Sequence, residues 1–553
     1  MNTEAKRFTG SFDPRSYDDW VGVATKALKT VPFDRLKSTT ADGITIEPIY
    51  ERNEAPSPIG ARAAGIPWAV MARIDIPGNK TANAQILEDL AGGASGLDLV
   101  FAESPNAGGF GLTVSCDGCV KTLLGGVHLD MIPIRIDGGH RSAEIAGLLL
   151  GIAEAQGKAL DLAVVQDPIG LLAASGRLGA KAEDAIAAAA EAAKGLPGTA
   201  LEVDGRVWHA AGASEAQELA AMLATGVTYL RALEAAGFDL EAAAAKIGFT
   251  AVADQNQFRS IAKLRALTLL WARVREACGL SAAAARVHVE TARRMMAKRD
   301  SFTNMLRTTI ATFAAGVGGA ASVTVLPFTQ AIGLPDAFAR RVARNTQSIL
   351  IEESNLHRVA DPAAGSGLVD TETAQLAELA WAGFQAIEAE GGILVALRTG
   401  SLHANVTATA KKRIDAIAKR REPVTGVSEF PNVLEGGVAV MDIAAPKART
   451  VEPAEHVTAF AAHGLGEAFE ALRDRADAAG VRPKVFMANL GRIADFTART
   501  TWAKNFFEAG GIAAVTNDGF ADLPALVQAY KASGAKAAVI ASSDAVYEAE
   551  AVK

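Results

Sequence analysis

The amino-acid sequence predicts an α/β protein in which a (β/α)8 barrel is followed by a smaller, flavodoxin-like domain. Eight short apolar segments alternate with helical segments over roughly 330 residues, the pattern of parallel strands that are each followed by a helix. A second series of strands and helices begins at Lys484, after a stretch that contains several prolines. At 553 residues the chain is long enough for two domains with separate cores.

Residues 1–40 are predicted to form a polar N-terminal arm, in which the segment 17–30 has the spacing of an amphipathic helix. Such a helix either covers the protein surface or binds a partner. Residues 41–400 are predicted to form the barrel. Its eight strands are expected at residues 67–74, 97–102, 128–136, 159–165, 200–204, 285–290, 322–326 and 356–361.

Helical segments separate the predicted strands. The helix at 371–390, after the eighth strand, stops at Gly391-Gly392. Between the fifth and sixth strands we expect an insert with two long helices, at 214–235 and 255–278. Reacting groups of such barrels lie at the C-terminal ends of the strands. A doubly wound sheet is the competing fold, but no pyrophosphate-binding fingerprint follows the first strand.

The last part of the chain is predicted to hold a linker and a partial second domain. Residues 401–480 form the linker region, and residues 481–553 contain three strands with helices between them. A flavodoxin-like sheet has five strands in the order 2-1-3-4-5. The third strand would then be an uncovered apolar edge, so we expect this domain to be C-terminally truncated.

Composition and charge point away from nucleic acids and membranes. The net charge is −7, from 55 basic and 62 acidic residues. The basic segment 411–423 is interpreted as a solvated helix face rather than a nucleic-acid footprint. No run of eighteen apolar residues occurs and the N-terminus has no signal-like apolar core, so we expect a cytoplasmic protein.

Three cysteines in the whole chain fit a reducing compartment. Cys116 and Cys119 form a lone C-x-x-C motif, without the second pair or the histidines that a structural zinc site requires. A redox role for this motif and an incidental pair of half-buried thiols are both open at this point.

Several motifs resemble the adenosylcobalamin-dependent acyl-CoA mutases, and in particular the methylmalonyl-CoA mutase family. The resemblance begins near residue 40 and extends through the rest of the chain. The matching motifs are Pro67-Trp68 with Asn83, Gly205 with Ala211-Gly212-Ala213, the segments 261–274 and 304–366, and Ala380-Trp381 with Glu388, Gly391 and Gly392. A barrel followed by a flavodoxin-like, cobalamin-binding-type domain is the layout that this resemblance implies.

Two motifs of the barrel depart from the catalytic members of the family. There the fifth strand leads into Gly-Tyr-His-Met-Gln-Glu-Ala-Gly-Ala, whose His contacts the thioester carbonyl; here the Tyr falls on Arg206 and the His on Val207. Valine has no donor to polarise a carbonyl. His209 lies two positions after Val207, and in a strand its side chain would point the same way as that of Val207. It stays open whether His209 takes over the role of the family His. On the first strand, the family Tyr that lies over the corrin is replaced by Arg73.

A third departure lies in the second domain. Cobalamin-binding domains of this type carry Asp-x-His-x-x-Gly, in which the His ligates cobalt and the Asp orients it. The aligned positions here are Ile493, Asp495 and Ala498. A carboxylate is a harder ligand than an imidazole, and no histidine follows His463. We therefore expect no catalytic residue, no cofactor-binding residue and no metal ligand on this chain.

The three departures together resemble the small, or beta, subunit of heterodimeric mutases. The resemblance implies a large, or alpha, partner subunit that binds adenosylcobalamin and the acyl-CoA substrate. That partner would interconvert (R)-methylmalonyl-CoA and succinyl-CoA, while this chain stabilises the pair, with Arg73 and Trp208 filling a closed barrel lumen. An acyl-CoA mutase that is active on its own, or a structural protein no longer paired with a mutase, are the alternatives.

Overall fold

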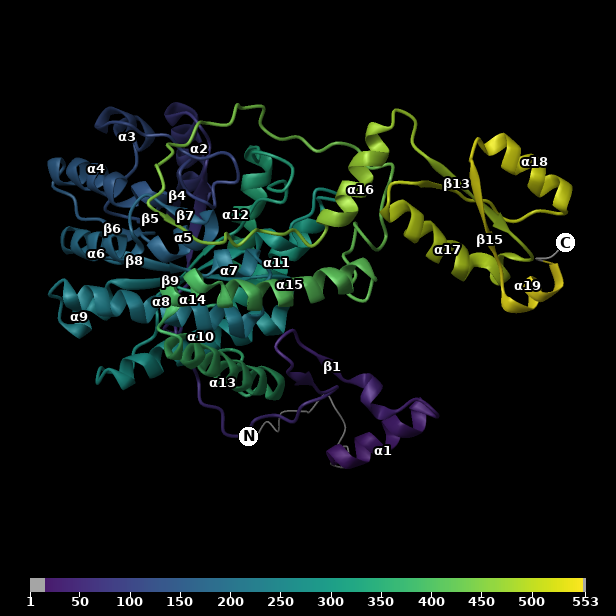
Figure 1. The fold of residues 1–553 in the computed structure, drawn as a ribbon, viewed down its shortest axis with the longest axis horizontal. Coiled ribbons are helices and arrows are strands. Elements are labelled where there is room, and N and C mark those ends of the chain that lie inside the picture. Colours follow the sequence, from purple (N-terminus) through teal and green to yellow (C-terminus); the bar gives the residue numbers. More distant parts are fainter. Residues whose placement is uncertain (1–14, 551–553) are drawn as a thin grey trace, which may run out of the picture.

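The computed structural model describes residues 15–550 and contains a closed barrel of eight parallel strands, so the predicted fold class is confirmed (Figure 1). The strands follow one another around the barrel in chain order. They are β3 (Ala69–Ile74), β4 (Gly96–Val100), β5 (Pro133–Asp137), β6 (Asp161–Val164), β8 (Leu201–Asp204), β9 (Ile247–Ala253), β10 (Val287–Thr291) and β11 (Ser322–Thr324).

The barrel closes where β6 meets the residues before β8. The Val164 N–H donates to the Thr199 carbonyl at 3.0 Å, and Ala163 and Thr199 form a parallel bridge. Gly198 makes this approach possible, because a Cβ there would lie 2.4 Å from the Leu162 carbonyl oxygen. Closure leaves the barrel without an exposed strand edge.

Helices cover the outer surface of the barrel, so the strands are buried on both faces. These helices are α2 (Asn79–Ala91), α4 (Ser142–Ala155), α6 (Ala182–Ala192), α8 (Glu215–Ala235), α10 (Gln257–Ala277), α11 (Thr303–Val317), α12 (Ala337–Glu352) and α13 (Gly367–Ala389). The short helix α3 (Asp117–Leu123) lies in the same outer layer, between α2 and α4. Two further short helices begin within four residues of a strand end: α5 (Pro168–Ser175) follows β6 and α7 (Arg206–Ala210) follows β8.

Two strand assignments from the sequence were wrong. The predicted eighth strand, residues 356–361, is a turn in which Asn355 has a φ of 54° and Val359 is 56% exposed. The missing strand is β9, which lies inside the predicted two-helix insert, between α8 and α10. Its sequence, IGFTAVA, is rich in small residues and carries a weak strand signal between two strong helical ones. The predicted sixth and seventh strands are therefore the seventh and eighth of the barrel.

The segment after the barrel folds back over the C-terminal ends of the strands. Helices α14 (Ile393–Thr399) and α15 (Ser401–Ala418) are followed by irregular chain, the short strand β12 (Glu455–His456) and α16 (Glu467–Ala478). Strand β12 pairs antiparallel with β7 (Arg177–Leu178). Beyond it, the Phe460 and His463 N–H groups donate to the Ala173 and Ala210 carbonyls at 2.9 Å each. This segment, 455–463, is called the strap below.

The second domain forms a separate lobe beyond α16 (Figure 1). Its elements are β13 (Lys484–Asn489), α17 (Ile493–Ala509), β14 (Ala513–Val515), α18 (Leu523–Ser533), β15 (Ala537–Ala541) and α19 (Asp544–Glu550). The parallel sheet has the order β14-β13-β15, which matches strands 2-1-3 of a flavodoxin-like sheet. Strand β15 forms one edge, where Ile540 is half exposed.

The N-terminal region begins with an exposed helix that stands away from the barrel (Figure 1) and continues into a short hairpin that packs on α8, where Asp42 accepts from the Ala216 N–H at 3.3 Å. The predicted amphipathic helix is present as α1 (Tyr17–Leu28), capped by Ser16, and none of its residues is buried. The hairpin consists of β1 (Ser38–Thr39) and β2 (Thr45–Ile46). The first fourteen residues of the predicted arm lie outside the described part of the chain.

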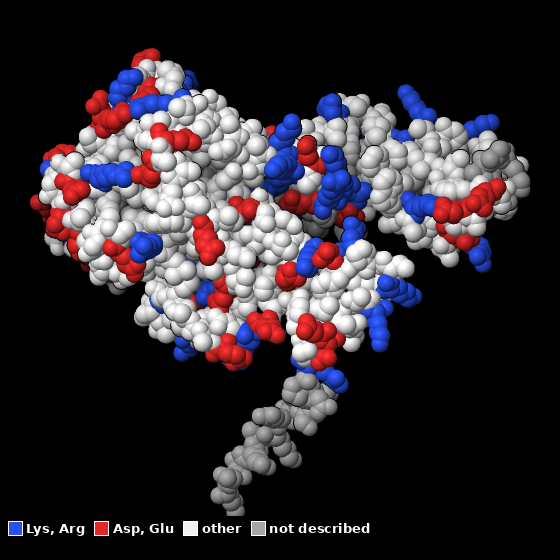
Figure 2. Space-filling view, turned by 60° about the horizontal axis from the view of Figure 1, so that its bottom comes forward, with Lys and Arg blue, Asp and Glu red and all other residues white. Residues whose placement is uncertain are grey.

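Acidic and basic side chains are interspersed over the face shown in Figure 2, with no continuous basic surface there. Between residues 15 and 550, no helix is long and apolar enough to cross a membrane.

Candidate functional site

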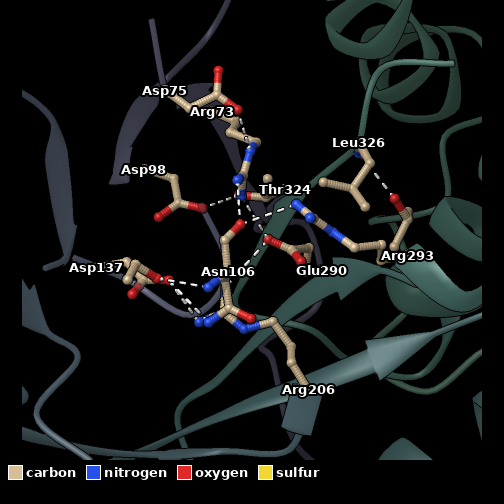
Figure 3. Close-up of polar contacts among 12 residues, drawn as sticks. Arg73, Asp75, Asp98, Asn106, Asp137, Arg206, Glu290, Arg293, Thr324 and Leu326 are labelled. Carbon is tan, nitrogen blue, oxygen red and sulfur yellow. Dashed lines mark hydrogen bonds and ion pairs between the residues drawn. The ribbon is translucent and has the colours of Figure 1, made fainter. Parts of the chain in front are cut away.

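The barrel lumen contains a network of buried charged side chains (Figure 3). Most of them come from alternate positions of the strands, which is the register that points side chains inward, while Asp75 and Arg206 follow the ends of β3 and β8. The network comprises Arg73, Asp75, Asp98, Arg135, Asp137, Glu202, Asp204, Arg206 and Glu290, all less than a tenth exposed. Because these side chains are largely removed from bulk water, their charges are stabilised mainly by pairing with one another.

Arg73 is held by three acceptors at once. Its Nε donates to Asp75 at 2.8 Å, one Nη donates to Glu290 at 3.2 Å, and the other donates to the Asn106 carbonyl at 2.7 Å. The side chain is buried, as expected for a residue that fills the lumen. Burial alone would lower the pKa of Arg73, but Asp75 and Glu290 outweigh it, so the pKa is raised. This guanidinium is therefore a permanently charged part of the barrel core.

Arg206, the first residue of α7, is paired as fully. It makes a bidentate contact with Asp204 at 2.9 and 2.8 Å, and donates to Asp137 at 2.8 Å. Its remaining Nη donates to Glu290 Oε2 at 3.2 Å, the same oxygen that accepts from Arg73. Glu290 therefore joins the two arginines across the lumen, as Figure 3 shows. The structure brings these two predicted positions together in one cluster.

A deeper layer of the lumen is centred on Arg135. This guanidinium donates to Asp98 at 2.8 Å, to Glu202 at 3.1 Å and to the Thr250 hydroxyl at 2.8 Å. Neither this layer nor the role of Glu290 was predicted from the sequence. The signal was present, since segments such as LDLV, PIRID and LEVD each place a charge at alternate positions of an otherwise apolar strand.

A cavity of about 610 Å³ lies above the network, at the C-terminal ends of the strands. Its floor includes Arg206 and Glu290, and its walls come mainly from α5, α6 and the strap. Val207 is one of the lining residues and presents only methyl groups. Arg293 also lines the cavity; its Nη2 donates to the Asn106 carbonyl at 3.0 Å. Burial, together with the neighbouring Arg73, lowers the pKa of Arg293 to about 10.

His209 also lines this cavity, but the relation expected between it and Val207 was wrong. Residues 206–210 form α7 rather than a strand, so the side chains of Val207 and His209 do not point in the same direction. The His209 Nδ1 lies 3.1 Å from Glu218, which is paired with Lys263 at 2.8 Å. Burial, with Arg294 and Lys263 nearby, holds the pKa of His209 well below its ordinary value. His209 is therefore neutral, and its Nε2 has no hydrogen-bond partner among the described residues.

Trp208 does not fill the lumen, contrary to expectation. It is buried on the other side of α7, where its ring meets Phe460 of the strap edge to face, with centroids 5.0 Å apart. An edge-to-face pair of this kind stabilises the contact beyond its buried area. The tryptophan therefore anchors the strap to the barrel mouth.

In the second domain, the aligned cobalamin motif is occupied by a helix cap. Asp495 accepts from the Arg492 N–H at 2.9 Å and from the Arg492 Nε at 3.1 Å at the start of α17. The hydrogen bonds from Arg492 lower the pKa of Asp495. Ile493 is 59% exposed and Ala498 also faces solvent. These residues provide no imidazole for cobalt and commit their one carboxylate to Arg492, so they do not fit the cofactor.

The surroundings of α17 agree with this conclusion. Phe496 is buried next to Gly519, where a Cβ would lie 3.2 Å from its ring. The last histidine of the chain, His463, belongs to the strap rather than to the second domain. Among residues 15–550, no group of three or more His, Cys, Asp or Glu side chains is placed to hold a metal ion.

Comparison with known proteins identifies related chains. The family model described as methylmalonyl-CoA mutase matches residues 62–479. The methylmalonyl-CoA mutase small subunit of Streptomyces virginiae is 41% identical, over 98% of this chain and 90% of the relative. The small subunit of Propionibacterium freudenreichii subsp. shermanii is 35% identical, over 97% and 86%. A methylmalonyl-CoA mutase of Cereibacter sphaeroides is 29% identical, over 77% and 66%.

Proposed function

The chain belongs to the methylmalonyl-CoA mutase family, and we propose that it is the small, non-catalytic subunit of a heterodimeric mutase. In this proposal a large subunit binds adenosylcobalamin and the acyl-CoA, and interconverts (R)-methylmalonyl-CoA and succinyl-CoA. The proposal rests on the names of the relatives and on the resemblance stated above. We also propose a cytoplasmic location, which the free thiols favour.

The observation that carries the non-catalytic part of the proposal is the ion-pair network in the lumen, where Glu290 joins Arg73 and Arg206. A catalytic barrel of this family has to admit the chain of coenzyme A, whereas this lumen is occupied by Arg73, Arg135 and Arg206 with their carboxylates. Each guanidinium already has two or more partners, so opening a channel would separate several buried ion pairs. Breaking one such pair by removing a partner costs about 3–5 kcal/mol.

Substrate activation lacks its donor as well. Val207, the position aligned with the family histidine, has no side-chain N–H to donate to a thioester carbonyl. Arg73, aligned with the family tyrosine, is fixed by three hydrogen bonds and is not free to move toward a ligand. In the second domain Asp495 caps α17. The loss of the side-chain donor at Val207 and the structural contacts of Arg73 and Asp495 support the non-catalytic role that we propose.

A subunit with a filled barrel suits a stabilising role. The lumen charges and the closed strand ring give it a rigid core that does not need to open during turnover. We propose that it stabilises the large subunit through a broad, obligate interface of the kind that exceeds about 2,000 Å².

One observation favours a second candidate, a mutase that is active alone. The cavity of about 610 Å³ at the barrel mouth is large enough for a small acyl group, and His209 lines it. Against this candidate, the imidazole is neutral and bonded to Glu218, and the second domain offers no cobalt ligand.

Co-expression tests the proposal. The chain is produced alone and together with a large mutase subunit, and each purified sample is analysed for subunit mass, corrinoid absorbance and turnover of methylmalonyl-CoA. We expect a 1:1 complex that contains corrinoid and is active, while the chain alone contains no corrinoid and is inactive. Turnover by the chain alone would establish the second candidate. Failure to form any complex would favour a structural protein no longer paired with a mutase.

A further inference from the structure

The C-x-x-C motif occupies a defined site in the connection between β4 and β5, outside the lumen network. Cys116 precedes α3 and Cys119 lies in its first turn. Their sulfur atoms are 3.0 Å apart, and the Cys119 N–H donates to the Cys116 carbonyl at 3.0 Å. A disulfide has an S–S bond of about 2.05 Å, so the two sulfurs need to approach by only about 1 Å. Cys116 is exposed and Cys119 half-buried, which makes the pair accessible to small reagents.

The backbone that carries the thiols is fixed from its buried side. Val120 and Leu123 of α3 are buried in the main core. The Asn83 side chain of α2 donates to the Leu123 and Gly125 carbonyls at 2.9 and 2.8 Å. The Cys116 thiol therefore faces solvent, and the Cys119 thiol lies half-buried at the border of the core of an anchored segment. A disulfide between them can close through movement of the exposed Cys116 side chain.

The environment of the pair favours thiol chemistry over metal binding. The hydrogen bond from the Cys116 thiol, with further bonds from Ser115, lowers the pKa of Cys119 to about 7. A large fraction of Cys119 is then thiolate at neutral pH, and the thiolate is the nucleophile in disulfide exchange. Within the described residues no third ligand accompanies the two sulfurs, whereas structural zinc requires four.

We propose that Cys116 and Cys119 form a reversible thiol–disulfide site, with low-molecular-weight disulfides as the oxidising substrate. The Cys119 thiolate attacks one sulfur of the small disulfide, whose S–S bond breaks and releases the first thiolate. Cys116 then gives up its proton, attacks the Cys119 sulfur and displaces the second thiolate. In sum, the dithiol loses two protons and two electrons and becomes an intramolecular disulfide, while the small disulfide gains them and is reduced to two thiols. The site is independent of the proposed mutase role.

Equilibration with glutathione tests the site. The full chain is incubated in buffers of increasing ratio of oxidised to reduced glutathione, quenched with acid, alkylated and analysed by peptide mass spectrometry. We expect the peptide with Cys116 and Cys119 to lose two hydrogens and escape alkylation, and dithiothreitol to reverse this. Cys278, an exposed lone cysteine, is the internal reference and forms only a mixed disulfide with glutathione.

Matched variants separate the steps. Cys116→Ser is expected to trap a glutathione adduct on Cys119 that does not resolve, and Cys278→Ser is expected to behave as wild type. The proposal is overturned if both motif cysteines of the wild-type chain are alkylated, or carry separate glutathione adducts, at ratios that modify Cys278. Retention of one equivalent of zinc by the purified chain, lost in Cys116→Ser, would assign the motif to metal binding instead.

Discussion

Neutralising Glu290 tests whether the lumen network stabilises the barrel. The Glu290→Gln substitution keeps the shape of the side chain but removes the charge that Arg73 and Arg206 share through one oxygen, at 3.2 Å each. Removing one member of a buried ion pair costs about 3–5 kcal/mol. Arg73 keeps Asp75, and Arg206 keeps Asp137 and Asp204, so we expect the low end, about 3 kcal/mol.

Urea denaturation followed by tryptophan fluorescence measures this loss, because Trp68, Trp208 and Trp271 are buried in or against the barrel. With an m-value of about 3 kcal/mol/M, a loss of about 3 kcal/mol lowers the midpoint by about 1 M. Glu276→Gln is the matched control. Glu276 is exposed on α10 and pairs with Arg273 at 3.4 Å, an exposed ion pair worth less than about 1 kcal/mol.

Two results would refute this reasoning. If Glu290→Gln and Glu276→Gln had the same midpoint, the lumen charges would contribute no net stability. If the folded complex with Glu290→Gln lost turnover while its subunits stayed associated, the lumen would belong to the catalytic machinery. We expect kcat of the complex to stay unchanged at temperatures where the variant is folded.

Three further predictions concern the histidine, the strap and the second domain. His288 is buried, and burial together with Arg135 and Arg206 holds its pKa well below the ordinary value. Between the two pKa values the unfolded chain therefore binds one proton more than the folded chain. Below pH 6.5 the free energy of unfolding of the wild type should fall by about 1.4 kcal/mol per pH unit relative to His288→Asn, as measured by urea titration. A flat difference between the two curves from pH 7 to 5 would contradict this. Phe460→Ala removes the ring that packs on Trp208 and should lower the free energy of unfolding by about 3–5 kcal/mol. A protease should also cleave the strap of this variant faster than that of the wild type. An unchanged cleavage rate would show that the strap is held by its backbone hydrogen bonds alone. Asp495→His should not give corrinoid absorbance in the isolated chain, because Ile493 and Ala498 still depart from the motif, and a bound corrinoid after this single change would disprove our interpretation of the second domain.

The fold could be predicted from the sequence because barrel strands and helices leave strong periodic signals, but the identity of one strand could not. Strand β9 consists largely of small residues between two helices, and its placement depends on pairing with β8 and β10, which is not a local property. The turn at residues 356–361 contains the apolar residues Leu356, Val359 and Ala360, but it has no strand partner among the described residues. The number of barrel strands was therefore easier to predict than which segment of the chain forms each strand.

The site was predictable in its positions and not in its interactions. The sequence marks Arg73 and Arg206 as departures from the catalytic pattern. These residues are 133 positions apart in the sequence, so the sequence does not indicate that they share a carboxylate. Glu290 lies in an apolar strand and becomes informative only when closure of the barrel brings β3, β8 and β10 together. Trp208 was misplaced because α7 turns it away from the lumen, a change that one helical turn after a strand makes without a strong sequence signal.

The two departures in the barrel are energetically coupled through Glu290, so they are not separate losses. Among residues 15–550, replacing Arg73 by the family tyrosine would leave Glu290 paired only with Arg206 and Asp75 paired only with Arg340, at 2.7 Å. A phenol carries no charge to offset either carboxylate, and the Coulomb energy of a buried pair depends steeply on its surroundings. Arg206 cannot be exchanged first either, because Asp137 and Asp204 would then lose their closest cation. Exchange of either arginine alone therefore separates buried charges, and the stability of the barrel itself favours keeping the filled lumen.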